Sequence, residues 1–450
     1  MIYRFLYKKI ILLILFVTIA NITAKSQDKW SLEQCVKYAI DNNIVVKQQT
    51  LNVNYKQNQY KQSKFDLIPN LNGSLGHSFS FGRSLTQYNT YTDKNSQNTD
   101  LSLNTSVTVF NGMSKQNTIK MRNLEMQAAL QDLEKTKDDI TLNVASAYLE
   151  ILFNKELVAA TKEQIKVTKE QIDYNKKQVE VGNMAKGKIF ETEAQLAQEE
   201  LTLTNYENKL KSSLLNLMQL LEIQVTDSFD IVTPEFNAEL LDAQLLSTNS
   251  IYNKAVNERP EILSKELTLQ SLEKAKAIAK AQLYPSLSMG ASYYNNYNNE
   301  YQYFDGSGKI PFDEQVKNNR RTNLYVTLKI PLFNGFQTRT NLNNTIINYE
   351  NSKYQLQLEK NNLMKQIQKV HLDAVSAMKK YYSSQKALES AQEAFRYVEE
   401  KFKLGIVTPL EYNDAKNKVT NAQSSFIQAK YEYIFRVKIL DFYNGKEIVL

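Results

Sequence analysis

The chain contains few of the residues that most often carry catalysis or covalent cross-links. It has one cysteine, Cys35, so no intrachain disulfide can form, and two histidines, His77 and His371. We find no nucleophile elbow, phosphate-binding loop or metal-ligand spacing. His77 falls on a predicted strand and His371 lies next to a helical seam position, so we interpret both as surface or packing residues. We therefore expect no enzyme, no cofactor and no metal site.

Long apolar runs are also scarce. The basic N-terminus precedes one apolar stretch, Ile10–Ala20, which the small residue Ala24 follows. This order is typical of a secretory signal peptide, and the stretch is shorter than the ~20 residues that a transmembrane helix needs. We predict a signal peptide over residues 1–24. No later run is long enough to span a bilayer as a helix.

The excess of positive charge is small. The formal net charge is +7, and the predicted signal peptide carries several of the bases and no acid. Elsewhere lysines and glutamates are interleaved along the predicted helices, which is typical of a solvated surface, so we expect no nucleic-acid partner. The high polarity argues against a helical membrane protein. It does not argue against a β-barrel, whose strands are apolar on one face only.

Glycine and proline are absent from two stretches of equal length, 113–181 and 336–404. Each stretch follows the tripeptide FNG, which ends at Gly112 and again at Gly335, 223 residues later. Because the two strongest helix breakers are missing, both stretches are predicted to be long helices. At 1.5 Å per residue each would reach roughly 100 Å, which few globular domains could contain.

Apolar residues recur every seven positions inside the first of these stretches. This heptad spacing predicts a helix that supercoils with a partner. Shorter helices flank each long one, and the turns between them contain Gly182 and Gly405, where a left-handed glycine is expected to end the helix. A further helix begins at Ser31, with Gln34 completing a predicted capping box. The heptad positions are Ile151, Val158, Ile165, Ile172 and Val179.

Four segments between the helices alternate with period two. Each has one apolar face and one face of small or polar residues, as a strand at an apolar boundary requires. A soluble β-sandwich also alternates, but small polar faces joined to ~100 Å helices fit better with a barrel that has lipid outside and water inside. The long polar connections between paired strands are expected on the outer side. The predicted strands are 70–82, 100–111, 285–297 and 321–333.

These landmarks occur twice in the same order, so the chain is interpreted as a tandem duplication. The first repeat covers 29–225, the second covers 246–445, and an irregular linker, 226–245, connects them. Four strands are too few to close a barrel, which needs about eight, and bare strand edges are not tolerated in lipid. We therefore expect the chain to oligomerise. The strand count alone permits a dimer or a trimer.

Several paired motifs are together similar to the TolC-like outer-membrane efflux proteins, over essentially the whole mature chain. They are IPNL and YPSL at the strand starts, the two FNG strand ends, and the tips VEVGNMAKGKIFETEAQL and FKLGIVTPLEYNDAKNKV. The resemblance implies an α+β membrane protein in the outer membrane of a Gram-negative bacterium. It implies a homotrimer that forms a twelve-stranded β-barrel, continued by a twelve-helix tunnel in the periplasm.

The same resemblance implies a function. We expect a passive exit duct of a tripartite efflux pump or a type I secretion system. Its partners would be a periplasmic adaptor (a membrane fusion protein) and, through the adaptor, an inner-membrane efflux pump or ABC transporter. The alternative is a periplasmic coiled-coil scaffold or adaptor without a channel. That alternative explains the long helices but not the four strands.

Two sets of site residues follow from the resemblance. In the family a Val-Gly-Leu-like turn at each helical tip meets the adaptor, and neither tip here matches it perfectly. Acids past the second tip would form carboxylate rings at a periplasmic gate, although acids also favour any helix start. In the first repeat Lys188 departs from the acidic pattern. The tip residues are Val181, Gly182, Asn183, Leu404, Gly405 and Ile406, and the gate residues are Glu411, Asp414, Lys188 and Glu191.

Overall fold

The computed structural model describes residues 29–85, 89–225, 228–234 and 246–448. The predicted signal peptide, 1–24, and most of the expected linker, 226–245, lie outside these residues. The chain divides into two compact units. The described residues of the sheet unit lie within 48–135 and 256–362, and those of the hairpin unit lie within 29–47, 136–255 and 363–448.

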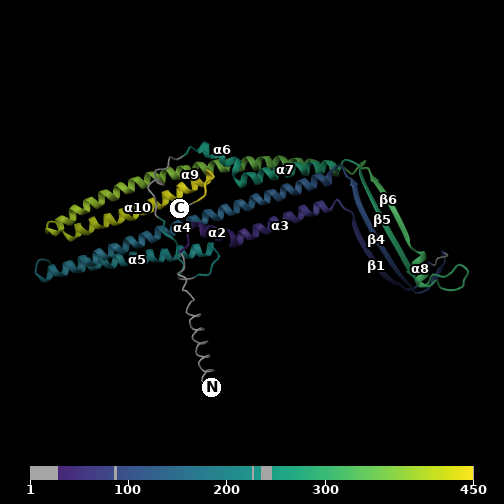
Figure 1. Cartoon of the computed structure of the whole chain (residues 1–450), viewed down its shortest axis with the longest axis horizontal. Helices are drawn as coiled ribbons and strands as arrows, with labels where there is room; N and C mark the ends of the chain where they lie inside the picture. Colours follow the sequence, from purple (N-terminus) through teal and green to yellow (C-terminus); the bar gives the residue numbers. More distant parts are fainter. Residues whose placement is uncertain (1–28, 86–88, 226–227, 235–245, 449–450) are drawn as a thin grey trace, which may run out of the picture. The chain divides into compact units, whose positions relative to one another are not determined.

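The sheet unit contains a four-stranded antiparallel sheet with the strand order β1-β4-β5-β6 (Figure 1). Because β4 pairs with β5, the two sequence repeats contribute two neighbouring strands each. Strands β1 and β6 occupy the edges of this sheet. The strands are β1 (Asn70–Ser80), β4 (Ser96–Phe110), β5 (Ser286–Asn298) and β6 (Arg321–Lys329).

The cross-strand register keeps apolar side chains on one face of the sheet. Leu75 is paired with Leu101, and Met289 is paired with both Val107 and Val326. On the other face the hydroxyls of Ser74 and Ser102 are 2.7 Å apart. The alternation predicted from the sequence is therefore confirmed, because successive residues of a strand point to opposite faces.

The strand ends differ from their predicted positions, and the differences are largest at the start of β4 and the end of β6. Strand β6 was predicted to reach residue 333 but ends at Lys329, two residues before Pro331, which has no N–H to donate to a ladder. Strand β4 begins at Ser96, where it is paired with Ser80. The connections hold a small hairpin of β2 (Arg83–Leu85) with β3 (Tyr91–Asp93), and the helix α8 (Phe312–Asn318).

The two FNG motifs form the turns that lead from strand to long helix. Gly112 and Met113 both have positive φ angles, 65° and 66°, and Gly335 and Phe336 repeat this with 62° and 63°. Two consecutive left-handed residues are costly for side chains other than glycine, so the glycine lowers the cost of the turn. The long helices that follow are α4 (Ser114–Glu180) and α9 (Gln337–Lys403).

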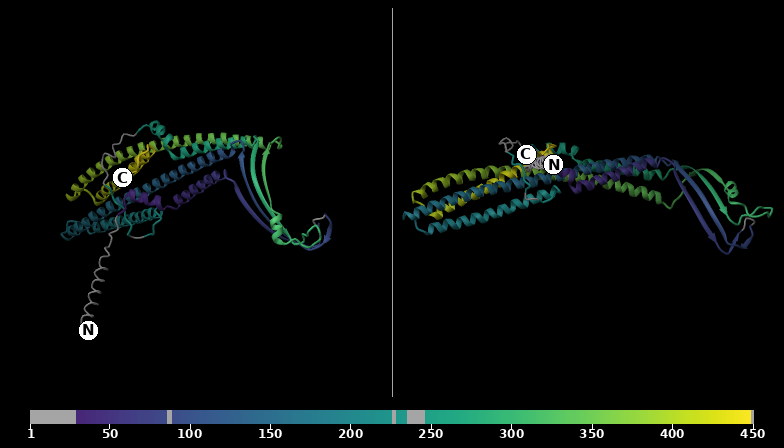
Figure 2. Two further views of the ribbon diagram at one scale, coloured as in Figure 1. Left: turned by 45° about the vertical axis from the view of Figure 1, so that its right-hand side comes forward. Right: turned by 60° about the horizontal axis from the view of Figure 1, so that its bottom comes forward.

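Two helical hairpins make up most of the hairpin unit. Helix α4 runs beside α5 (Gly187–Leu220), and α9 runs beside α10 (Pro409–Tyr443), as the views of Figures 1 and 2 agree. None of the helices in the described residues has an apolar stretch long enough to cross a membrane. The other helices of the described residues, from both units, are α2 (Leu32–Asn42), α3 (Ile44–Phe65), α6 (Thr248–Glu258) and α7 (Pro260–Ala281).

The N-terminal part of the hairpin unit is anchored to α4. The capping box predicted at the start of α2 is confirmed, since the Ser31 N–H donates to Gln34 Oε1 at 2.9 Å and the Gln34 N–H donates to Ser31 Oγ at 3.2 Å. Trp30 forms an isolated parallel β-bridge with Ile231. The hydroxyl of Tyr148, on α4, donates to the Val232 carbonyl at 2.6 Å. The described part of the expected linker therefore packs on α4.

Candidate functional site: the hairpin tips

Both long helices end in the same backbone motif. The Gly182 N–H donates to the Val179 carbonyl at 3.1 Å, and the Asn183 N–H donates to the Gln178 carbonyl at 2.9 Å. These two hydrogen bonds, with a φ of 78° at Gly182, form a Schellman motif.

The second tip repeats the motif. The Gly405 N–H donates to the Phe402 carbonyl at 3.0 Å and the Ile406 N–H donates to the Lys401 carbonyl at 3.0 Å, with a φ of 74° at Gly405. The prediction that a left-handed glycine ends each helix is confirmed.

Apolar side chains project from the tips into solvent. Val181 is 66% exposed, Leu404 is 74% exposed and Ile406 is 67% exposed. Asn183 and the two tip glycines are exposed as well. A Cβ added at Gly182 or Gly405 would meet no atom within 4 Å, so open space surrounds both turns. The tips therefore offer small apolar surfaces on rigid turns, which could contact another protein.

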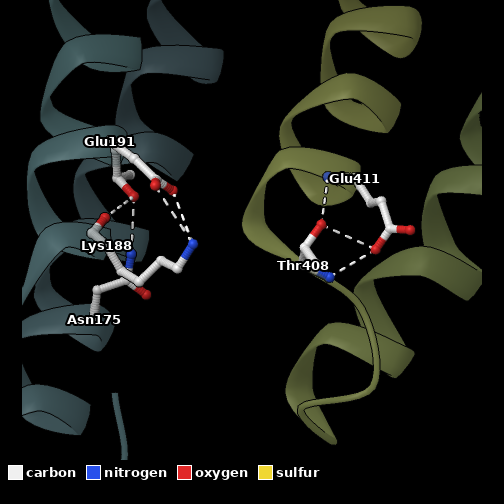
Figure 3. A network of polar contacts seen from close by, with 6 residues as sticks. Asn175, Lys188, Glu191, Thr408 and Glu411 are labelled. Carbon is white, nitrogen blue, oxygen red and sulfur yellow. Dashed lines mark hydrogen bonds and ion pairs between the residues drawn. The ribbon is translucent and has the colours of Figure 1, made fainter. Parts of the chain in front are cut away.

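The second tip continues into a fully capped helix (Figure 3). The Thr408 N–H donates to Glu411 Oε2 at 2.7 Å, and the Glu411 N–H donates to Thr408 Oγ1 at 3.3 Å. Pro409 occupies the first turn, where its missing N–H costs nothing. The hydrogen bonds from the Thr408 backbone and side chain lower the pKa of the Glu411 carboxyl below its ordinary value. The carboxylate proposed for a gate therefore also caps α10.

The first tip has no such cap. Helix α5 begins after Lys186, whose side chain makes no capping hydrogen bond, and Gly187 lies in its first turn. Here Lys188 forms an ion pair with Glu191, at 3.2 Å between Nζ and Oε2 (Figure 3). The four predicted gate residues therefore lie in two separate places. Lys188 and Glu191 pair with each other on α5. On α10, Glu411 bonds Thr408, and Asp414 is exposed one turn further along the helix.

Polar layers interrupt the apolar seam between α4 and α5. Asn154 Nδ2 donates to Ser213 Oγ at 3.3 Å, and Asn175 Nδ2 donates to Thr192 Oγ1 at 2.9 Å. Between them the Thr168 hydroxyl donates to the Glu199 carboxylate. The members on α4 are spaced by multiples of seven residues, so these layers alternate with the apolar heptad positions. Such polar layers select one register of a coiled coil at a cost in stability.

Lys416 of α10 reaches into one of these layers. Its Nζ lies 3.4 Å from Glu199 Oε1 and also donates to Thr168 Oγ1. The side chains of Lys416 and Glu199 are 5% and 8% exposed. Burial lowers the pKa of Lys416, and the charge of Glu199 opposes this shift. The contact is a buried ion pair between the two hairpins.

Some of these residues were missed by reasoning from the sequence. The segment Thr408-Pro-Leu-Glu411 has the Ser/Thr-x-x-Glu spacing of a capping box and could have been found. The polar residues spaced by seven on α4 were also visible beside the apolar heptads. The pair of Lys416 with Glu199 had no sequence signal, since both residue types are common on exposed helix faces.

The tips present exposed apolar side chains and charged side chains. Within the described residues, no group of three or more His, Cys, Asp or Glu side chains is placed to hold a metal ion. The tips combine exposed apolar turns with charged first turns of α5 and α10. Such an arrangement can bind a partner and attract or repel ions.

Comparison with known proteins places the chain in a family. A model of the family described as outer membrane efflux protein matches residues 36–222 and 251–445. The chain is 22% identical over 410 residues to toxin and drug export protein A of Aggregatibacter actinomycetemcomitans, covering 90% of this chain and 83% of that protein.

Two further similarities agree with this match. The chain is 22% identical over 308 residues to the outer membrane protein TolC of Vibrio cholerae, covering 67% of this chain and 66% of that protein. The fold is similar to that of the CmeC outer membrane channel of Campylobacter jejuni, with a TM-score of 0.77 and 19% identity over 92% of this chain and 85% of that one. The chain belongs to the outer membrane efflux protein family, whose TolC-like members are non-enzymatic efflux channels of the Gram-negative outer membrane.

Proposed function

We propose that three copies of the chain form one duct, whose helical tips dock a periplasmic adaptor. The observation that carries the proposal is the four-stranded sheet with β1 and β6 at its edges. Bare edges are not tolerated in lipid, and a barrel needs about eight strands or more. Because β1 and β6 run antiparallel to their neighbours in an even-stranded sheet, β6 of one copy can continue the antiparallel order with β1 of the next.

The tips supply the docking surface in this proposal. Val181, Leu404 and Ile406 are exposed apolar residues on rigid turns, and a helical adaptor could bury them. The adaptor would connect the duct to an inner-membrane efflux pump or ABC transporter, which supplies the energy. The alternative of a scaffold without a channel is not supported, because the chain belongs to a family of outer-membrane efflux channels.

Glu411 and Asp414 would form two carboxylate rings at the periplasmic end of the duct, with Lys188 and Glu191 nearby on the first hairpin. Rings of acids in a narrow pore concentrate cations. The capping role of Glu411 is compatible with this, because its second carboxylate oxygen still carries charge. Oligomer mass and planar-bilayer conductance of the purified full-length protein test the duct. A monomer without conductance would contradict it.

The gate can be tested separately from the cap. Glu411→Gln with Asp414→Asn removes both charges, and a Gln at position 411 can still complete the capping box. We expect larger single-channel conductance or weaker block by divalent cations in this double variant. Glu411→Ala is the matched control that removes charge and cap together. Unchanged conductance and block in the Gln/Asn variant would rule out the carboxylate gate while leaving the duct intact.

A further inference from the structure

Helix α8 packs on the apolar face of the sheet. Strand β5 keeps a regular register with β4 from Ser288 to Asn298, so Asn295 and Tyr297 project from the same face as Met289. Asn295 Nδ2 donates to the Val316 carbonyl at 2.7 Å. The rings of Tyr297 and Phe312 meet edge to face, with centroids 5.1 Å apart. The connection between β5 and β6 therefore returns along the outward side of the sheet.

Buried amides hold α8 in this position. Gln315 is 1% exposed. Its Nε2 donates to the Asn298 carbonyl at 2.9 Å and to the Ile310 carbonyl at 2.8 Å, while its Oε1 accepts from the Asn298 N–H at 2.9 Å. Asn319 Nδ2 donates to the Asn296 carbonyl at 2.8 Å. One face of α8 is thus bonded to β5, and α8 is a fixed part of the sheet unit.

The apolar face becomes polar at the level where α8 lies. On β6 the outward residues change from Leu324 to Thr322, and Arg320 precedes the strand with the same parity. Leu324 is paired with Ala291, and Thr322 is paired with Tyr293. In an outer-membrane barrel, aromatic residues border the apolar band where hydrocarbon gives way to headgroups. The level of Tyr293 therefore corresponds to the upper border of the band.

The remaining surface of α8 is apolar on one flank. Phe312 is 59% exposed and Val316 is 38% exposed, and their i, i+4 spacing puts them on one side of the helix. Below them, Leu324 is 83% exposed on the apolar face. The two exposed side chains of α8 therefore add apolar surface beside the apolar face of the sheet.

We propose that α8 and Arg320 form a contact with the outer-leaflet lipids of the outer membrane. Phe312 and Val316 lie at the boundary between acyl chains and headgroups, and Arg320 extends from the strand end to a lipid phosphate. Amphipathic helices bind at this depth by burying an apolar flank, and long basic side chains reach the headgroups from apolar surroundings. The contact would fix the height of the sheet in the bilayer. This lipid contact does not depend on the adaptor or on the carboxylate gate.

A lipid surface explains this flank better than a second copy of the chain. The flank is continuous with the apolar face of β5 and β6, which meets lipid in an outer-membrane channel. Arg320 follows α8 in the chain, just before β6, and a cation is expected beside phosphate groups. A second copy would pair with the backbone edge of β6, whereas α8 is bonded to β5, one strand further in.

Spin labels can measure the depth of each position in the full-length protein, reconstituted in phosphatidylcholine nanodiscs with and without lipid A. Val316→Cys probes the flank, Asn318→Cys probes the solvent side of the same helix, and Leu324→Cys probes the apolar band. All three residues are exposed. The native Cys35 is fully buried and should not label, and the protein without added cysteines checks this.

We expect the Val316 label to collide several-fold more often with oxygen than with a water-soluble nickel chelate, as the Leu324 label does. The Asn318 label should show the reverse. A Val316 label as accessible to nickel as Asn318, or shielded from both reagents by protein, would overturn the proposal. A Leu324 label accessible to nickel would instead contradict the membrane position of the sheet itself.

The role of the cation is tested by Arg320→Gln, with Arg320→Lys as the matched control. In nanodiscs that contain lipid A, Arg320→Gln should move the Val316 label toward water, and Arg320→Lys should leave its depth unchanged. If the Val316 label keeps the same depth in Arg320→Gln, Arg320 does not take part in the lipid contact.

Discussion

The two helical hairpins descend from one repeated pattern, yet their seams have different chemistry. In the first hairpin, polar layers such as Asn154 with Ser213 and Thr168 with Glu199 interrupt the seam. In the second hairpin, small and aromatic residues fill the corresponding region. Its buried cluster consists of Ala377, Tyr381, Ala429, Tyr433 and Val437. The tips differ in the same way, since only the second helix start has a capping box.

The difference shows which features of the repeat the fold requires. Both hairpins keep the FNG turn, the 67-residue helix and the Schellman ending, which set length and direction. The seam residues differ between the two hairpins, because both polar and apolar side chains can pack one helix against another. The polar seam selects one register, and the second seam packs alanine and aromatic side chains at the corresponding level. Lys416 links the two, since a residue of the second hairpin completes a polar layer of the first.

The largest effect is expected at this buried ion pair. Glu199→Ala leaves the Lys416 ammonium buried without its carboxylate, and breaking a buried pair in this way costs about 3–5 kcal/mol. Lys416→Met should cost less, because Thr168, Gln164 and Gln195 still donate to Glu199. Thermal unfolding of the purified protein, followed by circular dichroism, measures both changes.

The double variant Glu199→Gln with Lys416→Met is the matched control for this prediction. It removes both charges and should recover most of the stability that Glu199→Ala loses. Equal losses in all three variants would show that packing at this layer, and not charge pairing, links the hairpins.

A smaller and equal effect is expected at the two tip glycines. Gly182→Ala and Gly405→Ala place a Cβ in the left-handed region, which costs about 1–2 kcal/mol, and neither methyl group meets another atom. Thermal unfolding of the two single variants should therefore give matching losses. A clear difference between them would mean that the Schellman motifs are not equivalent, in contrast to their shared geometry.

The caps provide a sharper contrast between the tips. Thr408→Ala removes the N-cap of α10 and should cost about 1 kcal/mol, a typical value for such a cap. The N-cap of α5 is Lys186, so Lys186→Thr tests whether a cap can be added. We expect slower amide exchange in the first turn of α5 in that variant, measured by hydrogen–deuterium exchange with mass spectrometry. No change would indicate that the glycine at position 187 prevents capping.

The smallest effect is a pH dependence confined to the second tip. Hydrogen bonds from Thr408 lower the pKa of Glu411 from its ordinary value of 4.5, so the cap is stable above that pH and is lost as the pH falls through the lowered pKa. Amide exchange in the first turn of α10, corrected for its intrinsic pH dependence, should rise in this acid range. Glu411→Gln should abolish the dependence, and a similar rise at the first tip would contradict its assignment to Glu411.

Much of the fold could be predicted from local patterns. The absence of glycine and proline predicted the long helices, because helix propensity is a local property. Period-two alternation predicted the faces of the strands, and Ser31 with Gln34 predicted a helix start. The end of β6 was placed too late, because the alternation continues past Lys329 although Pro331 interrupts the ladder.

The candidate site was predicted less completely. The tip residues could be located, since a glycine at the end of a long helix marks its turn. The local partners of the gate residues could not be assigned in the same way. Glu411 bonds Thr408, and Lys188 bonds Glu191, because each side chain finds a partner within one helical turn.

The sequence by itself determined the elements of this protein: two long helices of equal length, their glycine turns and four strands with one apolar face. These follow from interactions between residues a few positions apart. Only the tertiary structure decided that Lys416 pairs with Glu199 and that α8 returns to the apolar face of β5. Both contacts join residues on different elements, and their energies depend on burial and distance, which no local pattern encodes.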